Sequence, residues 1–350
     1  QDIATINPKS DPLQNTFIYI DLEAVEKGEL RKIQEIMREE APSRAQRVID
    51  NNDILFQCVR PYQKNNYIHR ILNTSNQQWV ASTGYAQIRT TELPNYIYHL
   101  LNTDEFNRKV MVRCTGSSYP AINSEDLATI HLYYTPDKKE QLKISRLLDL
   151  LDKRIATQNK IIEKLQSLIK GIAQHCIKES TSGNTYVKLG DICQITTGKL
   201  DANAQVDNGI YPFFTCAEQP FKIDSFAFDT EALLISGNGA NLGYINYYKG
   251  KFNAYQRTYV LDLFSENIQY IKWALKVLLP KRIAIEKSSS NTPYIVLSTL
   301  TDLRLPIPCK SKQSFIANLM QSLERKLSNQ IAQYDSYNYL KQYLLRQMFI

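Results

Sequence analysis

The sequence predicts an α+β fold, with two pseudo-two-fold-related mixed α/β domains joined by two long antiparallel helices that form a coiled coil. Two observations predict it. First, the chain is one unit written twice, because Ser117 to Ile122 recurs as Ser290 to Ile295 at an offset of 173 residues. Second, each copy ends in a long stretch whose apolar residues fall at alternating steps of four and three, which is a heptad seam.

The repeat extends in both directions from that turn. Upstream, Asp2-Ile3 and Tyr96-Ile97 match Asp191-Ile192 and Tyr270-Ile271. After a slip of one residue, the segment that follows Pro136 recurs after Pro308. A duplicated unit makes a pseudo-two-fold molecule, which suits a partner that is itself roughly two-fold. Duplex DNA is the commonest partner of that kind.

The first domain is expected over residues 1–135. Strands are predicted at 16–20 and 53–56, and one helix over 93–110 that begins at Pro94. The chain begins at Gln1 within what resembles a strand, so a few residues of the first unit are expected to be missing. The second domain is expected over 185–308, with strands at 232–235 and 259–261. A turn is predicted at 237–239, and a helix over 268–279 that Pro280 ends. The linker over 179–185 is expected to be flexible.

The two long helices are expected over 136–180 and 309–350, each with roughly 35 regular residues that would extend about 50 Å. Antiparallel packing about a dyad places Gln158 and Gln330 at the centres of the two seams. We therefore expect these glutamines to meet and to fix the register at a cost in stability. Replacing both by leucine should stabilise the helix pair and loosen its register. Lys341 interrupts the second seam, which is weaker.

Composition restricts the function only loosely. The net charge of +7 permits nucleic-acid binding without requiring it. The 22 tyrosines suit a polar recognition surface, or reflect only an AT-rich genome. The six cysteines have no disulfide or metal spacing, so a reducing cytoplasm is expected. No apolar run approaches the roughly 20 residues that span a bilayer, so no membrane partner is expected.

No catalytic or metal site is expected. The four histidines are not in metal-ligand spacing. Thr196 to Leu200 imitates a phosphate loop but lacks its first glycine and its hydroxyl residue. The glycines at 237, 239 and 243 follow a strand, but no clear helix follows them. Asn291 to Tyr294 resembles the Asn-Pro-Pro-Tyr motif of adenine methyltransferases, but its repeat partner has no Asn, so a structural turn is favoured.

DNA-contacting residues are predicted from residue chemistry, since Arg, Lys, Asn and Gln read bases while Lys, Arg, Ser, Thr and Tyr bind phosphates. In the first unit the candidates lie in the loop after strand 53–56 and before the repeated turn. The matching loop of the second unit is 236–244. An ordinary solvated turn is the competing interpretation of both loops. The candidates are Arg60, Lys64, Asn65, Tyr67, Arg113, Asn238, Asn241, Gln256, Arg257, Lys287 and Asn291.

The whole chain resembles the specificity (S) subunit of type I restriction–modification systems. The resemblance rests on the duplication and on local phrases such as Lys188 to Ile192, Tyr211 to Thr215 and Leu147 to Ile155. It implies two target recognition domains and no catalysis in this chain. It also implies double-stranded DNA, two methyltransferase (M) subunits and two restriction (R) subunits as partners. S-adenosylmethionine, ATP and magnesium would then belong to the partner subunits, with no cofactor here.

Two alternatives stay open. One is a stand-alone DNA adenine methyltransferase relative, which the absence of a credible cofactor loop argues against. The other is a coiled-coil scaffold that joins partners other than DNA, for which a flat salt dependence of DNA binding would argue.

Overall fold

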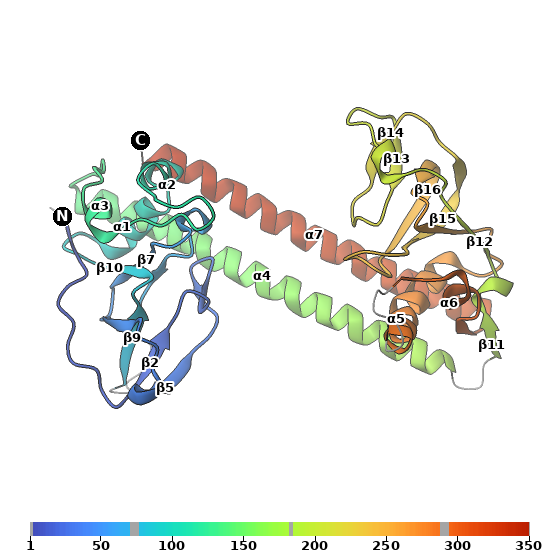
Figure 1. The fold of residues 1–350 in the computed structure, drawn as a ribbon, viewed down its shortest axis with the longest axis horizontal. Coiled ribbons are helices and arrows are strands. Elements are labelled where there is room, and N and C mark those ends of the chain that lie inside the picture. The colour runs from blue at the N-terminus through green and yellow to red at the C-terminus, as the bar shows by residue number, and fades with distance from the viewer. Residues whose placement is uncertain (1–2, 71–76, 182–184, 288–293, 350) are drawn as a thin grey trace. The chain divides into compact units, whose positions relative to one another are not determined.

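The computed structural model describes residues 3–70, 77–181, 185–287 and 294–349 (Figure 1). The chain forms two compact units. Unit 1 comprises residues 1–159 with 332–350, and unit 2 comprises residues 160–331. Each unit therefore contains one mixed α/β domain and one part of each long helix, α4 (Lys138–Thr181) and α7 (Lys310–Met348).

Among its described residues, unit 1 has two four-stranded sheets and three short α-helices. The first sheet has the order β1 (Ala4–Ile6), β10 (Tyr85–Thr90), β7 (Ile54–Gln57), β8 (Tyr67–Ile68). The second has the order β5 (Gln34–Met37), β2 (Thr16–Ile20), β9 (Gln78–Ser82), β6 (Ala45–Val48). The other elements are the hairpin β3 (Val25–Glu26) and β4 (Glu29–Leu30), the 3-10 turns Arg38–Glu40 and Pro61–Gln63, and helices α1 (Pro94–Leu101), α2 (Asp104–Met111) and α3 (Ser124–Ala128).

Unit 2 is built on one six-stranded sheet. Its order is β12 (Gln194–Thr197), β17 (Thr258–Asp262), β15 (Phe228–Ser236), β16 (Ile245–Ala254), β13 (Tyr211–Phe214), β14 (Phe221–Ile223). A separate ladder pairs β11 (Thr185–Lys188) with β18 (Arg304–Ile307). The helices are α5 (Ile268–Lys287) and α6 (Leu297–Thr301), with 3-10 turns at Leu189–Asp191 and Ala202–Ala204.

The duplication is present in the topology. The antiparallel order β1-β10-β7-β8 of unit 1 is the order β12-β17-β15-β16 of unit 2. Helices α3 and α6 are related by the offset of 173 residues that takes Ser124 to Leu297. The same backbone bond closes both copies, because the N–H of Ile122 donates to Cys58 and the N–H of Ile295 donates to Gly237. The two domains are therefore one fold, enlarged differently at its edges.

Two predicted helix boundaries are wrong. The single helix expected over 93–110 is two helices, because α1 ends at Leu101 with Asn102 as its C-cap, and Thr103 accepts the Phe106 N–H as the N-cap of α2. The helix expected to end at Pro280 continues to Lys287. A proline removes one backbone bond from a helix interior. Contacts beyond it offset that loss, including the bond from the Thr299 hydroxyl to the Glu286 carboxylate at 2.7 Å.

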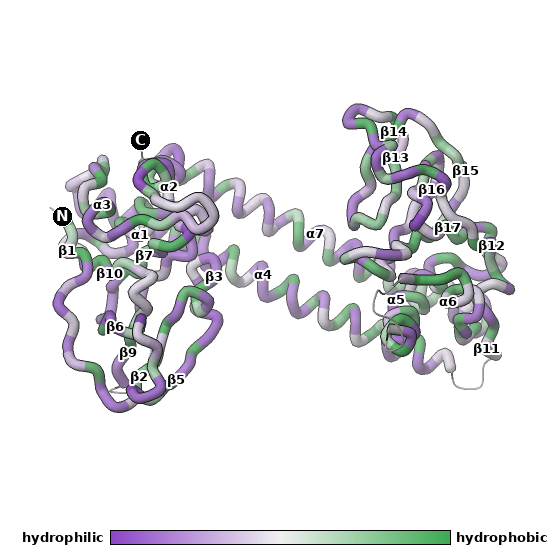
Figure 2. Tube along the Cα trace, viewed as in Figure 1, coloured by the Kyte–Doolittle hydropathy of each residue, from purple (hydrophilic) through white to green (hydrophobic). Residues whose placement is uncertain are grey.

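The cores of both units include the long helices. In unit 1, Leu148 of α4 lies in one buried cluster with Leu345 of α7 and with Phe349, which follows that helix. In unit 2, Leu165 and Ile169 of α4 lie in one cluster with Ile316 and Met320 of α7. Within each unit the two helix segments run antiparallel, as predicted. Figure 2 shows polar and apolar residues alternating along both helices, as a seam with a solvated face requires.

Lys341, which interrupts the predicted seam, is neutralised within unit 1 by Asp152 of α4 at 2.5 Å. Gln158 belongs to unit 1 and is buried, whereas Gln330 belongs to unit 2 and is half-buried. Their expected meeting stays a prediction. No helix among the described residues is long and apolar enough to cross a membrane. Residues 182–184 of the predicted linker lie outside the described part of the chain.

Replacing Leu148 by alanine should lower the free energy of unfolding of unit 1 by about 2–5 kcal/mol, because its side chain is fully buried. Leu150, two residues away on the same helix, is 64% exposed and provides the matched control. Its replacement should cost only a few tenths of a kcal/mol. Urea unfolding followed by circular dichroism measures both, and equal losses for the two variants would show that α4 does not belong to the core of unit 1.

Candidate nucleic-acid interface

Four segments of unit 2 meet at one end of its sheet. The loop between β15 and β16 is bonded to the turn before β17, through the Gly237 N–H to the Arg257 carbonyl at 2.8 Å. The same turn reaches the end of β13, through the Tyr255 N–H to Phe214 at 2.9 Å. It also reaches the segment after β12, through the Gln256 N–H to Leu200 at 2.9 Å. These bonds bring four of the sequence-predicted residues together: Asn238, Asn241, Gln256 and Arg257.

Asn238 and Asn241 both contact Cys216. The Cys216 thiol donates to the Asn238 side-chain oxygen at 3.0 Å, and the Asn241 amide donates to the Cys216 carbonyl at 3.0 Å. Each asparagine therefore has part of its hydrogen-bonding capacity used in joining two loops. An amide has four hydrogen-bonding positions, so both can still bond a ligand. Their first effect is to fix the loop end of the sheet.

Gln256 and Arg257 are exposed at this end of the sheet, with Lys199 exposed on the neighbouring segment. Lys199 was missed in the sequence because its surroundings were interpreted only as a failed phosphate loop. The bridge between Leu200 and Tyr255 places it beside the predicted pair. Two cations and an amide on adjacent loops form a surface suited to phosphates and base edges.

The continuation of α5 beyond Pro280 reaches the same loops. A Cβ added at Gly243 would contact the Ile283 side chain at 2.7 Å, so helix and loop are in close contact there. Lys287 is the last residue of α5, and its side chain is outside the described part of the structure. Asn291, in the motif-like segment 291–294, also lies outside the described residues.

In unit 1 the equivalent loop joins β7 to β8 and carries Arg60. Its backbone is left-handed, with φ of 54°, a conformation that costs energy for a residue other than glycine. The Arg60 N–H donates to Pro120 at 2.7 Å, and the guanidinium lies 4.2 Å from the centre of the Tyr119 ring. Tyr119 is 64% exposed, so the stacked pair faces solvent. Tyr119 was missed because the repeated turn was used only to align the two copies.

Two other candidate residues of this loop, Lys64 and Asn65, already form hydrogen bonds within the protein. The Lys64 ammonium donates to Asp104 at 2.8 Å and to the Asn102 carbonyl at 3.1 Å. This hydrogen bond, with that of Arg346, lowers the pKa of Asp104 in spite of its partial burial. The Asn65 side-chain oxygen accepts the Lys27 N–H at 3.0 Å. Both side chains stiffen the loop that presents Arg60.

Tyr67 and Arg113 lie beside the loop surface. Tyr67 packs against the small core of unit 1, and burial raises the pKa of its hydroxyl. Arg113 donates to the Lys109 carbonyl at 2.8 Å and immediately precedes the turn that pairs Thr115 with Ala121. Ser117 and Ser118 in that turn are exposed. The exposed Tyr119 ring and these hydroxyls, with the half-buried Arg60, therefore form one polar surface of unit 1.

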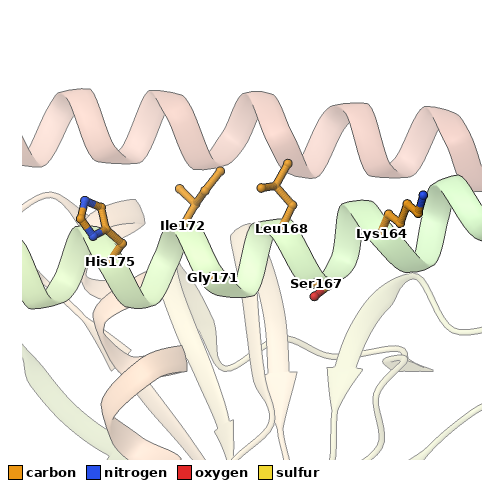
Figure 3. Close-up of a pocket in the computed structure, with 6 residues that line it drawn as sticks. All are labelled: Lys164, Ser167, Leu168, Gly171, Ile172 and His175. Atoms are coloured by element: carbon orange, nitrogen blue, oxygen red, sulfur yellow. The ribbon is translucent and has the colours of Figure 1, made fainter.

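A groove of about 510 Å³ follows α4 within unit 2. Figure 3 shows Leu168 and Ile172 pointing toward α7, with Lys164 and His175 at the two ends. Ser167 and Gly171 complete its lining. Leu168 is 53% exposed, so the groove is an open apolar surface, which suits a protein contact.

The described histidines of unit 1 that are fully buried have structural partners. His99 contacts Asp149 of α4 at 2.8 Å, and His69 lies 4.9 Å from the Trp79 ring. Burial lowers the pKa of His69 to about 4, so it is neutral at pH 7. Among the residues that the structure describes, no group of three or more His, Cys, Asp or Glu could hold a metal ion.

The chain is similar to several type I specificity subunits. It is 44% identical to the EcoDI specificity subunit of Escherichia coli over 137 residues, which are 39% of this chain and 30% of that protein. It is 24% identical to the MjaIX specificity subunit of Methanocaldococcus jannaschii over 274 residues, 67% of this chain and 63% of that one. The chain thus spans less than a third of the length of the EcoDI subunit.

Two solved structures share the fold. One is the S subunit of a type I restriction–modification system from M. genitalium, with a TM-score of 0.68 and 17% identity. The match covers 100% of this chain and 94% of that one. The other comes from a study of the assembly and conformational transition of a type I system, with a TM-score of 0.58 and 22% identity over 95% of this chain and 91% of that one.

The family model of the type I restriction modification DNA specificity domain matches residues 2–167 and 181–334. The two matches correspond to the two copies of the repeated unit. Because they cover nearly the whole chain, the protein belongs to the family of type I restriction–modification DNA specificity subunits.

Proposed function

We propose that the chain is the sequence-specific DNA-binding subunit of a type I restriction–modification enzyme. Each unit reads one block of a bipartite target. The observation that carries this proposal is the duplicated sheet end, where two copies of one fold present polar and basic side chains. In unit 1 the exposed Tyr119 ring stacks on the half-buried Arg60, and in unit 2 Gln256 and Arg257 are exposed. These residue types contact base edges and phosphates.

The two blocks of the target differ in sequence. The loop of unit 1 presents a stacked arginine and tyrosine, whereas that of unit 2 presents amides joined through Cys216. Surfaces with different donors and acceptors select different base pairs. The target is therefore asymmetric. Two linked weak readers also gain affinity from effective concentration, so neither block needs to bind tightly alone.

Two methyltransferase subunits dock on a surface that includes the long helices, and two restriction subunits then join the complex. Both helices carry large apolar side chains that are exposed in the isolated chain, which supports a docking role. They are Leu142, Leu147, Leu150, Ile161 and Leu168 in α4, and Phe315, Ile331, Tyr339, Leu340 and Tyr343 in α7. In this proposal the chain itself is not catalytic, and S-adenosylmethionine, ATP and magnesium bind the partner subunits.

A long-read adenine methylome tests the proposal. The cognate methyltransferase subunit is expressed in a host without adenine methylation, once together with this chain and once without it. Methylation at one asymmetric bipartite motif that depends on this gene is expected. Methylation that continues unchanged without it would contradict the proposal.

The two other classes of function have their own measurements. Binding of S-adenosylmethionine by the isolated chain would favour a methyltransferase. DNA affinity that does not change between low and high salt would favour a scaffold, because phosphate contacts release counterions and make binding salt-dependent.

A further inference from the structure

A buried glutamine in the first turn of each long helix makes the same three hydrogen bonds in both units. Gln313 of α7 accepts the Asn267 N–H at 3.0 Å and donates to the Glu266 carboxylate at 2.6 Å and the Pro308 carbonyl at 2.8 Å. Gln141 of α4 does the same. It accepts the Leu93 N–H at 3.3 Å and donates to Glu92 and to the Thr135 carbonyl, both at 2.7 Å. Both side chains are fully buried.

The lysine three residues before each glutamine contacts the same glutamate carboxylate that the glutamine bonds. Lys310 contacts Glu266 at 2.7 Å, and Lys138 forms the equivalent ion pair with Glu92. The hydrogen bonds from Lys138 and Gln141 lower the pKa of Glu92. For Glu266, partial burial raises the pKa, but the bonds from Lys310 and Gln313 outweigh it and the net pKa is lowered. Both carboxylates are thus held in the charged form that the amide and the lysine need.

A second contact lies about three turns further along α7 and about two turns further along α4. Glu324 of α7 binds Lys272 and Lys276 of α5, at 2.7 and 3.2 Å. In unit 1 the equivalent face of α4 carries Asp149, which contacts His99 of α1 at 2.8 Å. Each long helix is therefore joined to its own domain at two points, of which the first is the same in both units and the second differs in chemistry.

The first contact joins three parts of each domain. In unit 2 these are the segment before α5, the end of the strand that leads into α7, and α7 itself. Apolar packing is non-directional and allows a helix to rock on its neighbours. A buried amide with its bonds satisfied restricts direction, because each bond requires a set angle and an unmade bond costs free energy. This arrangement fixes the direction in which the helix leaves the domain.

The two units have diverged at their loop ends but not at this contact. The loop between β7 and β8 has a stacked arginine, and its counterpart in unit 2 has asparagines on a cysteine. The glutamine amide, the glutamate carboxylate and the lysine ammonium are the same in both units, and the same atoms bond one another. A feature that is retained while the recognition surfaces differ serves something that both halves share, and what they share is the spacing device.

We propose that Gln141 and Gln313 are positioning residues that set how far apart the two DNA blocks of an accepted target lie. This inference rests on the proposed function. Each glutamine holds its recognition domain at one angle on its helix, so that only one gap between the blocks places both loop surfaces on the bases. Neither residue contacts DNA.

The test uses the complete methyltransferase complex and duplexes in which the gap is changed by one base pair at a time. The variants are Gln141→Ala and Gln313→Ala, with Gln166→Ala and Gln321→Ala as controls, since these glutamines are exposed on the same two helices. The wild type and the controls should methylate one gap. Gln141→Ala and Gln313→Ala should each lower the preference for that gap over its neighbours by roughly tenfold. An unchanged preference in a folded variant would sink the inference.

A second measurement does not depend on DNA. Spin labels at Lys222 of β14 and Lys326 of α7, both exposed and both in unit 2, report the angle between domain and helix. The distance distribution should broaden in Gln313→Ala and stay narrow in Gln321→Ala. If Gln313→Ala does not fold, Glu266→Gln replaces it, because it keeps an acceptor for the amide and removes the charge. A narrow distance distribution in the folded variant contradicts the positioning role of Gln313, even if the wild-type complex methylates DNA as proposed. A wild type without any bipartite preference overturns the proposed function instead.

Discussion

Replacing Gly198 by alanine should destabilise unit 2 by about 3 kcal/mol or more, the largest effect on stability that we expect from a single methyl group in this chain. The residue follows β12, where its N–H donates to the Thr258 carbonyl at 3.3 Å. A Cβ at this position would overlap the carbonyl groups of Ala254 and Tyr255. These are backbone atoms of the turn that carries Gln256 and Arg257, so they cannot move without separating β12 from β17 or displacing the recognition loop.

Gly171 is the matched control, because it also belongs to unit 2 and a Cβ there would meet nothing within 4 Å. Within a helix, alanine is favoured over glycine by about 1 kcal/mol, so Gly171→Ala should stabilise the same unit. Urea unfolding of both variants, with tryptophan fluorescence from Trp273 to follow unit 2, measures the difference. Equal stabilities would mean that the strands of this sheet end can separate freely.

Replacing Arg60 by alanine should weaken recognition of one DNA block by about 1–3 kcal/mol, a loss of roughly 5- to 150-fold in affinity for the correct sequence, and leave the other block unaffected. The reason is geometric. The left-handed backbone, the bond to Pro120 and the stack on Tyr119 hold the guanidinium in one orientation. A preorganised arginine can donate two bonds to one guanine, whereas a lysine cannot match that planar fork.

Three further variants make this result specific. Arg60→Lys keeps the charge and should still lose most of the discrimination. Arg257→Ala should damage recognition of the other block only. Lys64→Ala should act mainly through stability, because its ammonium already bonds Asp104. Binding is measured at one salt concentration against duplexes altered in one block at a time. If Arg60→Ala weakens binding to every sequence equally, Arg60 contacts phosphate.

The repeat and the two long helices could be predicted from the sequence, because both depend on regular spacing. Leu148 and Met320 fall in the predicted seams and are buried in the cores. The points at which a helix ends or continues could not be predicted in the same way. Pro280 is a helix terminator by intrinsic preference, and only the contacts of Ile283 and Glu286 with distant segments explain why α5 continues. The two strands that widen the second sheet, β13 and β14, join it through a parallel pairing with β16 that no local pattern encodes.

The candidate site, like the fold, could be predicted only in part from the sequence. Residue types alone predict the loop between β7 and β8 and its counterpart as candidate DNA contacts, since polar and basic residues gather there in the sequence. The partners of those residues could not be identified in advance. Asn238 and Asn241 are joined to Cys216, which lies 22 and 25 positions away, and Lys64 is joined to Asp104, 40 positions away. Which polar groups remain available to a ligand is decided by such long-range pairing.

The way α7 enters the core of unit 1 has a consequence for the order of folding. Leu345 and Phe349 are buried among residues of the first domain, and the Phe349 ring lies 5.2 Å from that of Tyr96. Unit 2 is a continuous segment of chain, whereas unit 1 needs residues that the ribosome makes only after all of unit 2. The domain that is synthesised first therefore finishes folding last. Until then its exposed apolar surface is open to chaperones, to proteases and to association with other nascent copies.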